Sequence, residues 1–383
     1  MRVLKILLLI GLLMGLVACG SQAGPEPASD APATSEDTAD DASAEEDASD
    51  DGSEEASEDA SDDESDDASE DEGEDDGEQA SSPDKVTIRL SWKIKGEFAP
   101  PFVAAAEGCF ADEGVDVEVL EGSGAGAVIQ SLVAGNDQIG YLDAPAMVLG
   151  VHQDIPVIMV ANYLKRLPMI LVANPDVTLE GPADLEGKQL AVSPFDSFTR
   201  LLPTFTSLHD LDLDSIEQVN LETSIWQQSL LSGQIDIMPA FQTNDYYTLL
   251  NVAPEDAEFD TLELWEYGLD MLGHGLVVSE SYLEENPDTV RAVIRGMNCG
   301  VQLTMEDPEN AADILVEQFP EALDRDVVLQ QIDELGNFMG ETENLGVNTQ
   351  DAWDQTLDLM VDSEQIDSRR SDEEYYTNEY LPE

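Results

Sequence analysis

Basic residues are scarce in this sequence. Fifteen lysines and arginines stand against 84 aspartates and glutamates, which gives the 383-residue chain a formal net charge of −69 at pH 7. A charge of this size repels phosphate backbones and anionic lipid surfaces. We therefore expect no nucleic-acid partner and no attraction to an anionic membrane surface.

Histidine and cysteine are also scarce, with three of each. His152, His209 and His274 are not spaced as metal ligands with one another or with a cysteine, so the sequence predicts no metal site. It also lacks a Gly-x-Ser-x-Gly turn, a phosphate-binding Gly/Lys loop and a His/Cys cluster. These absences indicate a protein that is not an enzyme and that needs no cofactor.

Cys109 and Cys299 are the cysteines of the region that we expect to fold. Both lie in apolar helical patterns, which favours two buried thiols. A disulfide between them is chemically allowed outside the cytoplasm.

Residues 1–18 have the pattern of a secretory signal peptide. Arg2 and Lys5 precede an apolar run, 6–17, that is too short for a convincing membrane span. The residues around Cys19 resemble a bacterial lipoprotein box, which implies that the Cys19 thiol is lipidated and anchors the mature chain to the outer face of the cell membrane. The alternative is an ordinary signal peptide with an incidental cysteine.

Residues 19–84 are expected to be a disordered acidic tether. Positions 20–84 hold 28 of the acidic residues and no lysine or arginine. Such a segment buries too little apolar surface to offset its ordering entropy, and its charges repel one another. A spacer between membrane and folded region is favoured over an acidic binding tail.

The folded region remains strongly acidic after this segment is set aside. Because Arg2 and Lys5 also lie outside it, residues 85–383 keep a net charge near −43. Molar salt shortens the range of charge repulsion to a few ångströms. We therefore expect a protein adapted to high external salt.

Strand and helix patterns alternate from residue 85 onward, which predicts an α/β fold with mainly parallel sheets and right-handed crossovers. The expected strands are 86–90, 115–120, 138–141, 155–161, 169–173, 189–192, 217–221, 235–238 and 273–278. The expected helices are 100–110, 126–134, 144–151, 197–208, 224–231, 244–251, 288–305, 309–318, 325–339 and 349–362.

The pattern predicts two lobes joined by a double-strand hinge. Residues 85–173 and 272–383 would form the first lobe, and residues 174–271 the second, with crossings near 170–175 and 270–276. In such folds the ligand sits where strand ends from both lobes face each other.

Several segments, in the same order along 86–382, resemble one known family. They include EGCFADEGVDV at 107–117, ADLEGK at 183–188, LLSGQID at 230–236 and YTNEYLP at 376–382. The family is that of the extracytoplasmic solute-binding proteins of ABC importers, in the branch with the nitrate, sulfonate and thiamine-pyrimidine-precursor binders. This resemblance implies the type II periplasmic-binding-protein fold.

The resemblance also implies a function and its partners. The expected role is capture of a small organic solute by lobe closure and delivery to ABC permease and ATPase subunits, by a monomer held at the membrane through Cys19. A pyrimidine-type thiamine precursor or a similar heteroaromatic is favoured, and a sulfonate or nitrate is the alternative. Two other classes stay open: a sensory lipoprotein, and a pyrimidine synthase of the same fold, which uses a cysteine-rich motif that this chain lacks.

In the first lobe, the candidate ligand-binding residues follow predicted strands. Trp92 can stack on a flat ligand or close the edge of the core. Glu97 and Phe98 share its loop, and Glu97 either binds donors on the ligand or is simply solvated. Ser123 and Gly124 open a helix whose free N–H groups would face the cleft, unless the glycines serve only tight packing. Asp143 either caps a helix or binds the ligand.

In the second lobe, the matching loop offers Asp196, Ser197 and Thr199 at a helix start. The remaining candidates have aromatic or amide side chains, which suit a heteroaromatic ligand. They are Phe241, Gln242, Asn244 and Tyr267.

Overall fold

The computed structural model describes residues 84–194, 196–340 and 344–382. The predicted signal peptide, the predicted lipidation site Cys19 and nearly all of the predicted acidic tether lie outside the described residues. Among the described residues, no helix is both long and apolar enough to cross a bilayer.

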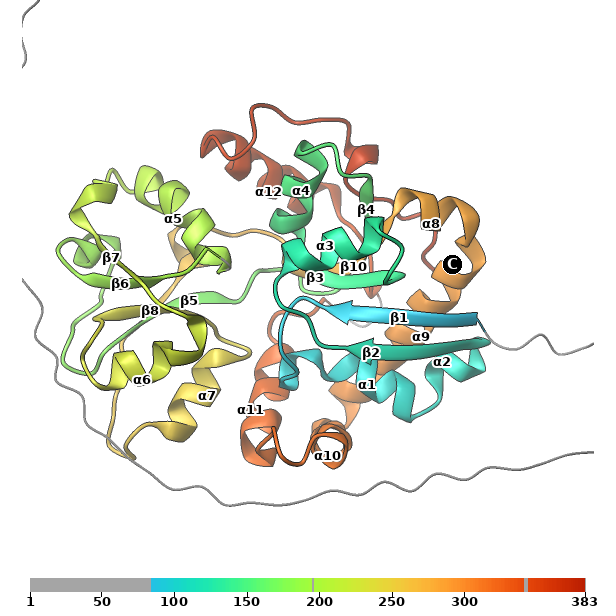
Figure 1. The fold of residues 1–383 in the computed structure, drawn as a ribbon, viewed down its shortest axis with the longest axis horizontal. Helices are drawn as coiled ribbons and strands as arrows, with labels where there is room; N and C mark the ends of the chain where they lie inside the picture. Colours follow the sequence, from blue (N-terminus) through green and yellow to red (C-terminus); the bar gives the residue numbers. More distant parts are fainter. Residues whose placement is uncertain (1–83, 195, 341–343, 383) are drawn as a thin grey trace, which may run out of the picture. The chain divides into compact units, whose positions relative to one another are not determined.

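Two five-stranded sheets organise the described chain (Figure 1). The first has the order β2-β1-β3-β10-β4 and the second the order β7-β6-β8-β5-β9. We call each sheet with its covering helices a lobe. The strands of the first lobe are β1 (Asp84–Leu90), β2 (Val115–Leu120), β3 (Ile139–Asp143), β4 (Val157–Asn162) and β10 (His274–Ser279). Those of the second are β5 (Met169–Ala173), β6 (Gln189–Val192), β7 (Glu217–Asn220), β8 (Ile237–Phe241) and β9 (Thr261–Glu263).

Helices cover both faces of the first sheet. Their bounds are α1 (Ala99–Ala106), α2 (Cys109–Asp112), α3 (Ala125–Val133), α4 (Ala144–His152), α8 (Glu280–Glu285), α9 (Pro287–Glu306), α10 (Pro308–Gln318), α11 (Arg325–Leu335) and α12 (Gln350–Asp362). One hydrophobic core lies between the sheet and α1, α9, α10 and α11. The other lies under α3, α4 and α12.

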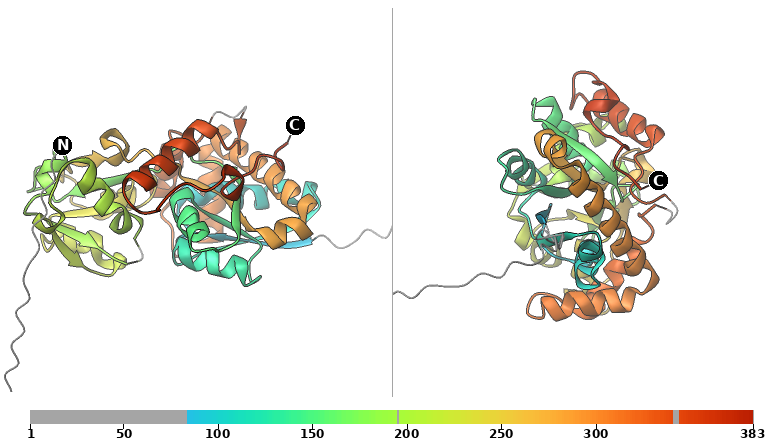
Figure 2. Two further views of the ribbon diagram at one scale, coloured as in Figure 1. Left: turned by 90° about the horizontal axis from the view of Figure 1, so that it is seen from above. Right: turned by 90° about the vertical axis from the view of Figure 1, so that its right-hand side faces the viewer.

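The second sheet is flanked by α5 (Ser197–Leu208), α6 (Trp226–Leu231) and α7 (Asp245–Val252). The core beneath α5 continues into the first lobe through Leu167, Leu272 and Trp353. Figure 2 shows α12, in red, lying over the region between the lobes. The Thr356 hydroxyl on α12 accepts a hydrogen bond from the Leu272 N–H at 2.9 Å, so this helix buttresses the connection.

The mainly parallel sheets that the sequence predicts are only partly observed. β1 runs parallel to β2 and β3, and β6 runs parallel to β7 and β8, as alternating strands and helices require. β5 and β10 run antiparallel to their neighbours. Each of these two strands enters its sheet from the other lobe without a crossover helix, which reverses its direction.

The lobe boundary lies earlier than the sequence predicted. β5 pairs with β8 and β9, so residues 169–173 belong to the second sheet and not to the first lobe. The crossings are therefore residues 163–168 and 268–273. The Leu167 N–H donates to the Met271 carbonyl at 2.8 Å and the Gly273 N–H to the Leu164 carbonyl at 3.0 Å, which makes the hinge a paired double segment. The sequence also missed β9 and α8.

Cys109 and Cys299 form a disulfide, with Cα atoms 6.0 Å apart, so the prediction of two buried thiols is wrong. The reason lies in close helix packing. A Cβ at Gly296 would lie 2.4 Å from a Phe110 ring carbon, and one at Gly300 would lie 2.4 Å from the Pro100 carbonyl oxygen. These glycines let α9 approach α1 and α2, which brings the two sulfurs together. The predicted helix 100–110 is also broken, at Gly108, where φ is 80°.

Candidate functional site

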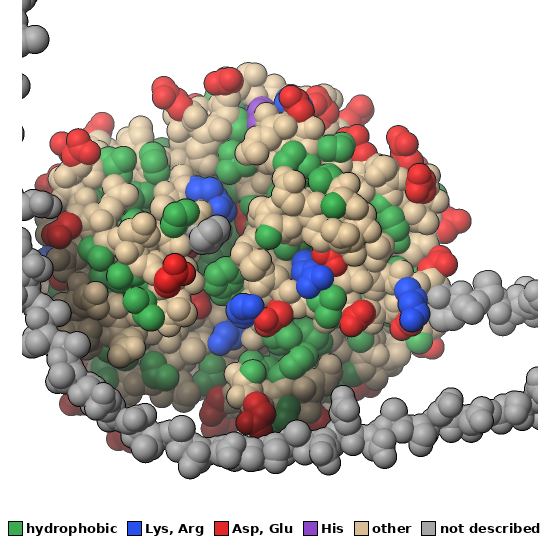
Figure 3. Space-filling view, in the orientation of Figure 1, with side chains coloured by type: hydrophobic (Ala, Val, Ile, Leu, Met, Phe, Trp, Pro, Cys, Tyr) green, Lys and Arg blue, Asp and Glu red, His purple; other side chains and the backbone are tan. Residues whose placement is uncertain are grey.

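A cleft of about 490 Å³ lies between the two lobes, within the usual size range of small-molecule sites. Its walls come from segments that follow β1, β2, β6, β7 and β8, together with residues at the ends of β3, β5, β8 and β10. Figure 3 shows the hollow between the lobes, with several of the few basic side chains near its rim and acidic side chains spread over the surrounding surface.

Aromatic side chains reach the cleft from both lobes. Trp92 comes from the first lobe, and Trp226 and Phe241 come from the second. Trp226 is fixed by a 3.2 Å hydrogen bond from its Nε1 to the Leu221 carbonyl. A flat apolar ligand would therefore find ring surfaces on both sides of the lobe boundary.

Glu97 is a deeply buried carboxylate of the cleft, with 4% of its surface exposed. It lies in the short helix η1 (Gly96–Phe98). Its Oε2 accepts a hydrogen bond from the Thr243 hydroxyl at 2.8 Å, and its Oε1 accepts one from Asn244 Nδ2 at 2.5 Å. Burial raises the pKa of Glu97 to about 7, and the two hydrogen bonds oppose that rise.

Two aspartates cap helices at the cleft. Asp143 accepts a hydrogen bond from the Ala146 N–H at 2.9 Å, which is the capping alternative for this residue. Asp196 accepts from the N–H and the hydroxyl of Thr199, at 2.7 and 3.1 Å. Burial raises the pKa of Asp196 to about 6 despite these bonds. Thr199 thus supports Asp196 and does not itself line the cleft.

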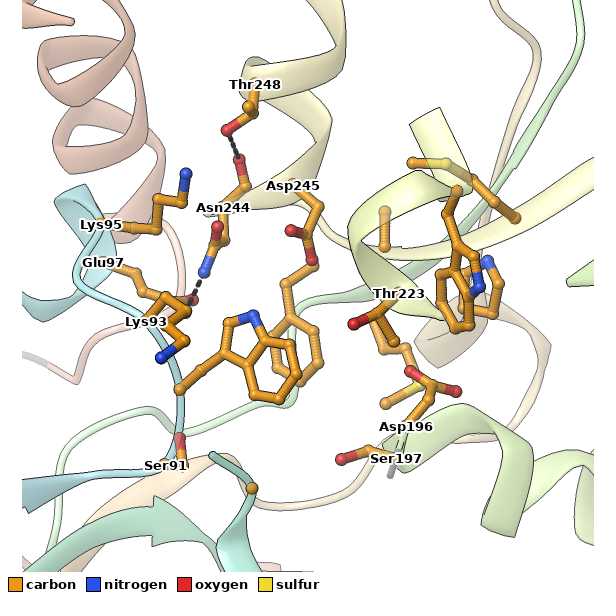
Figure 4. Close-up of a pocket in the computed structure, with 18 of the residues that line it drawn as sticks. Ser91, Lys93, Lys95, Glu97, Asp196, Ser197, Thr223, Asn244, Asp245 and Thr248 are labelled. Carbon is orange, nitrogen blue, oxygen red and sulfur yellow. Dashed lines mark hydrogen bonds between the residues drawn. The ribbon is translucent and has the colours of Figure 1, made fainter. Parts of the chain in front are cut away.

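The charges at the cleft are mixed but mainly negative. Lys93 and Lys95 line it from the first lobe, and Glu222 and Asp245 line it from the second. Figure 4 shows the lysines with Glu97 on one side, Asp196, Ser197 and Thr223 on the other, and Asp245 pointing between them. Burial raises the pKa of Asp245, and Lys95 opposes that rise.

A histidine lies at the base of the cleft, on β10. His274 Nε2 is 2.9 Å from the Ser91 hydroxyl oxygen, and both residues are buried. Burial lowers the pKa of His274, so the imidazole is neutral at pH 7. Within the described chain, no group of three or more His, Cys, Asp or Glu side chains is arranged to hold a metal ion.

The structure brings eight of the predicted site residues to the cleft and leaves five outside its lining. Those at the cleft are Trp92, Glu97, Gly124, Asp143, Asp196, Ser197, Phe241 and Asn244. The Gly124 N–H is not free as predicted, because it donates to the Ser91 carbonyl at 2.8 Å.

The five other candidates have positions that account for their absence from the lining. Phe98 is packed in the core of the first lobe, and Thr199 donates two hydrogen bonds to Asp196, the cap of α5. Ser123 lines a separate pocket beside Arg89 and Asp137. The Gln242 N–H donates to the Pro168 carbonyl, and the Tyr267 hydroxyl donates to the Glu180 carbonyl.

Sequence reasoning missed one whole wall of the cleft. Residues 222–224, with Trp226 and Gln227, follow β7 just as Trp92 follows β1. The same signal, polar and aromatic residues directly after a strand, was available there and would have found them. His274 gave no comparable signal, because only the crossing of the chain between lobes brings β10 to the cleft.

The family model described as NMT1/THI5 like matches residues 95–311. Among solved structures, the fold is similar to that of an alkanesulfonate-binding protein from Xanthomonas axonopodis pv. citri bound to MOPS. That similarity has a TM-score of 0.58 and 16% identity, and covers 74% of this chain and 94% of the other. The two-lobed α/β architecture is therefore that of a periplasmic binding protein.

Curated relatives cover most of the chain at low identity. A riboflavin-binding protein from Chloroflexus aurantiacus is 22% identical over 311 residues, 78% of this chain and 86% of the relative. A formylaminopyrimidine-binding protein from Halalkalibacterium halodurans is 22% identical over 284 residues, which cover 72% of this chain and 84% of the relative. A 4-amino-5-hydroxymethyl-2-methylpyrimidine phosphate synthase from Legionella pneumophila is 22% identical over 306 residues, 79% and 94%.

Proposed function

Because this chain belongs to the NMT1/THI5-like family, we propose that it is the solute-binding component of an ABC importer. It captures a small organic solute between its lobes and delivers it to a membrane permease. The observation that carries this proposal is the cleft, whose lining comes from strand ends of both lobes, with Trp92 on one and Trp226 on the other. A solute that touches both lobes favours the closed form by its differential affinity for that form.

The lining favours a neutral or amine-bearing heteroaromatic, such as a pyrimidine-type thiamine precursor. Tryptophan faces suit flat rings, and the carboxylates Asp196, Glu222 and Asp245 suit N–H donors. Two relatives are named for riboflavin and formylaminopyrimidine binding, which supports this class. A sulfonate or nitrate would depend on Lys93 and Lys95 among mainly negative neighbours, although the similar alkanesulfonate-binding structure keeps this alternative in the test.

The site of action is the outer face of the cell membrane, with Cys19 as the lipid anchor. The disulfide between Cys109 and Cys299 supports a location outside the reducing cytoplasm. A radiolabelled solute should be taken up less by cells that lack the protein, and less by cells with Cys19→Ala if the anchor is needed. Normal uptake without the protein would favour a sensory role.

A thermal-shift screen of aminopyrimidines, riboflavin, alkanesulfonates and nitrate tests the solute class. We expect a heteroaromatic to raise the melting temperature and Trp92→Ala to abolish that shift, whereas Glu107→Ala, on the exposed end of α1, preserves it. A shift by sulfonate or nitrate alone would select the anion alternative. Superimposable scattering profiles and no shift with any compound would refute the proposal.

The enzymatic alternative is separable by product analysis. Cys109 and Cys299 are joined in a disulfide and neither lines the cleft. A carrier returns its bound solute unchanged after denaturation, as mass spectrometry can measure. Formation of a new pyrimidine product would instead favour the activity for which the Legionella pneumophila relative is named.

A further inference from the structure

Hydrogen bonds between residues of this chain join the two lobes along one side of the cleft. Glu97, in η1 of the first lobe, accepts from Thr243 and Asn244, which precede α7 of the second lobe. Thr243 and Asn244 are 0% and 1% exposed. Breaking this contact in a solute-free opening would leave buried polar groups that must find water.

A buried glutamine makes a second connection at the same place. Gln331, on α11 of the first lobe, is fully buried. Its Nε2 donates to the Asn244 carbonyl at 2.8 Å, and its Oε1 accepts from the Gly96 N–H at 2.8 Å. The Gln331 side chain therefore connects η1, which carries Glu97, to Asn244, which donates to Glu97.

Close backbone packing fixes the distance between these groups. A Cβ on Gly96 would lie 2.6 Å from both Gln331 Cβ and the Val328 carbonyl oxygen. Only glycine lets η1 approach α11 this closely. Further out, the Tyr247 hydroxyl donates to Glu334 Oε2 at 2.9 Å, so α7 meets α11 at a second point.

The chemistry of Glu97 also fixes the orientation of the Asn244 amide. The ionised carboxylate only accepts, so Asn244 turns its NH₂ group toward Glu97, with Nδ2 donating to Oε1. Its Oδ1 is then buried without a hydrogen-bond partner among the described residues. Asn244 is among the residues that line the cleft, so the contact with Glu97 fixes part of the cleft wall.

We propose that Glu97 and Gln331 are positioning residues that clasp Asn244 across the lobe boundary before any solute binds. In this proposal the side of the cleft formed by Glu97, Gln331 and Asn244 keeps its contacts when a solute binds, and the rest of the two lobes moves around it. The inference goes beyond the proposed function, because the clasp contains only residues of this chain and forms whatever the solute is.

The hydrogen bonds of the clasp can form with Glu97 either ionised or protonated, but the stability of the clasp differs between the two states. A protonated Glu97 can donate to the Thr243 hydroxyl and still accept from Asn244. The titratable groups around Glu97 are Lys95 on its own loop, Asp245 on α7 and Tyr141 on β3. On α11, the titratable group is Glu334, which accepts a hydrogen bond from Tyr247. α1 carries no titratable side chain.

Hydrogen exchange on the solute-free full chain tests the clasp directly. In Gln331→Ala we expect the backbone amides of residues 96–98 and 245–249 to exchange at least tenfold faster together, with little change elsewhere. The matched control is Gln330→Ala, because Gln330 is the exposed neighbour on the same helix. Unchanged exchange in both segments of Gln331→Ala would overturn the proposal.

Variants of Glu97 separate positioning from simple packing. Glu97→Gln can donate to Thr243 and accept from Asn244, so it should keep protection within about threefold of the native protein, whereas Glu97→Ala should lose it. The pKa of Glu97 is raised in the clasp, so deprotonation of Glu97 weakens the clasp as pH rises. After correction for intrinsic exchange, protection of these amides from hydrogen exchange in the native protein should fall by up to about tenfold per pH unit between pH 5 and 7. Glu97→Gln should show no such fall. Equal loss in Glu97→Gln and Glu97→Ala would contradict the clasp. These readouts need no solute, so they are independent of whether the proposed function holds.

Discussion

Arg166 and Asp270 form a two-point ion pair between the two crossing segments of the hinge. Arg166 Nε and a second guanidinium nitrogen donate to the two Asp270 oxygens at 2.7 and 2.8 Å. The guanidinium also lies over the Trp265 ring, 5.8 Å from its centroid. The hinge strands are thus held by their side chains as well as by their backbones.

Removing this ion pair should loosen the hinge more than it destabilises the fold. Both partners are partly exposed, so Arg166→Ala should lower the free energy of unfolding by only about 1 kcal/mol. We expect a larger change in the rates of solute association and dissociation, measured by stopped-flow tryptophan fluorescence. Arg295→Ala, which breaks an exposed pair with Glu113 away from the hinge, is the control and should leave the rates unchanged.

Asn244 should affect solute affinity through the cleft wall that its contact with Glu97 fixes. Asn244 lines the cleft and donates to Glu97, so Asn244→Ala removes a contact that fixes this wall, and Asn244→Asp would place a second carboxylate beside Glu97. We expect Asn244→Ala to weaken binding of the best solute from the screen by about tenfold, consistent with one lost hydrogen bond, and Asn244→Asp to weaken it further. Titration calorimetry measures both, with exposed Gln218→Ala as the control. Unchanged affinity in both Asn244 variants would contradict this role.

The two buried carboxylates should make the protein more stable in mild acid than at neutral pH. The pKa values of Glu97 and Asp196, about 7 and about 6 in the folded state, lie above their ordinary values. The contribution of these two groups to the free energy of unfolding is therefore full below pH 4 and is lost as the pH rises through 6 and 7. For Glu97 the loss is about 3 kcal/mol.

Urea unfolding at pH 5 and pH 7.5 measures this difference. Glu97→Gln and Asp196→Asn should each reduce it, because neither amide titrates and asparagine can still cap α5. If both variants kept the native pH dependence, other groups would have to cause it.

Salt should stabilise the folded region strongly. Its net charge is near −43, and the ion pairs seen in the structure are mostly at the surface. We expect the melting temperature to rise steadily as KCl increases from 0.1 to about 2 M, because screening weakens the repulsion between carboxylates. An uncharged osmolyte of equal osmolality is the control; an equal rise with it would argue against screening.

Loss of the disulfide should destabilise the fold without changing the cleft. The bond between Cys109 and Cys299 closes a separation of 190 residues, for which chain entropy gives up to about 5 kcal/mol. Cys109→Ser with Cys299→Ser should therefore unfold at lower urea. Its solute affinity at low temperature should match that of the native protein, since neither residue lines the cleft. A large loss of affinity would instead show that the α2–α9 contact shapes the site.

Local sequence was a good guide where local physics decides. β2 and β5 lie at their predicted bounds because β-branched apolar runs between turn residues favour strands. α5 begins at Ser197 because Asp196 caps it. The same reasoning placed Trp92, Asp143 and Asp196 at strand ends, which is why they meet in one cleft.

Long-range packing decided what local patterns could not predict. Assignment of β5 to the second sheet depends on its partners β8 and β9, which lie 64 or more residues later in the sequence. Pairing of Cys109 with Cys299 depends on glycines that let α9 approach α1 and α2. Neither the sheet to which β5 belongs nor the pairing of the two cysteines can be predicted from the residues next to them in the sequence.

The sequence by itself determined the α/β character, the acidity, the order of most elements and the strand-end loops that hold the candidate site. These follow from periodicity, capping and composition, which act over a few residues. Only the tertiary structure decided that Glu97 is buried against Thr243 and Asn244, that Gln331 joins them, and that His274 reaches the cleft. Burial and hydrogen bonding between residues 87 to 183 positions apart arise from how the lobes pack, and that packing sets both the pKa of Glu97 and the orientation of the Asn244 amide.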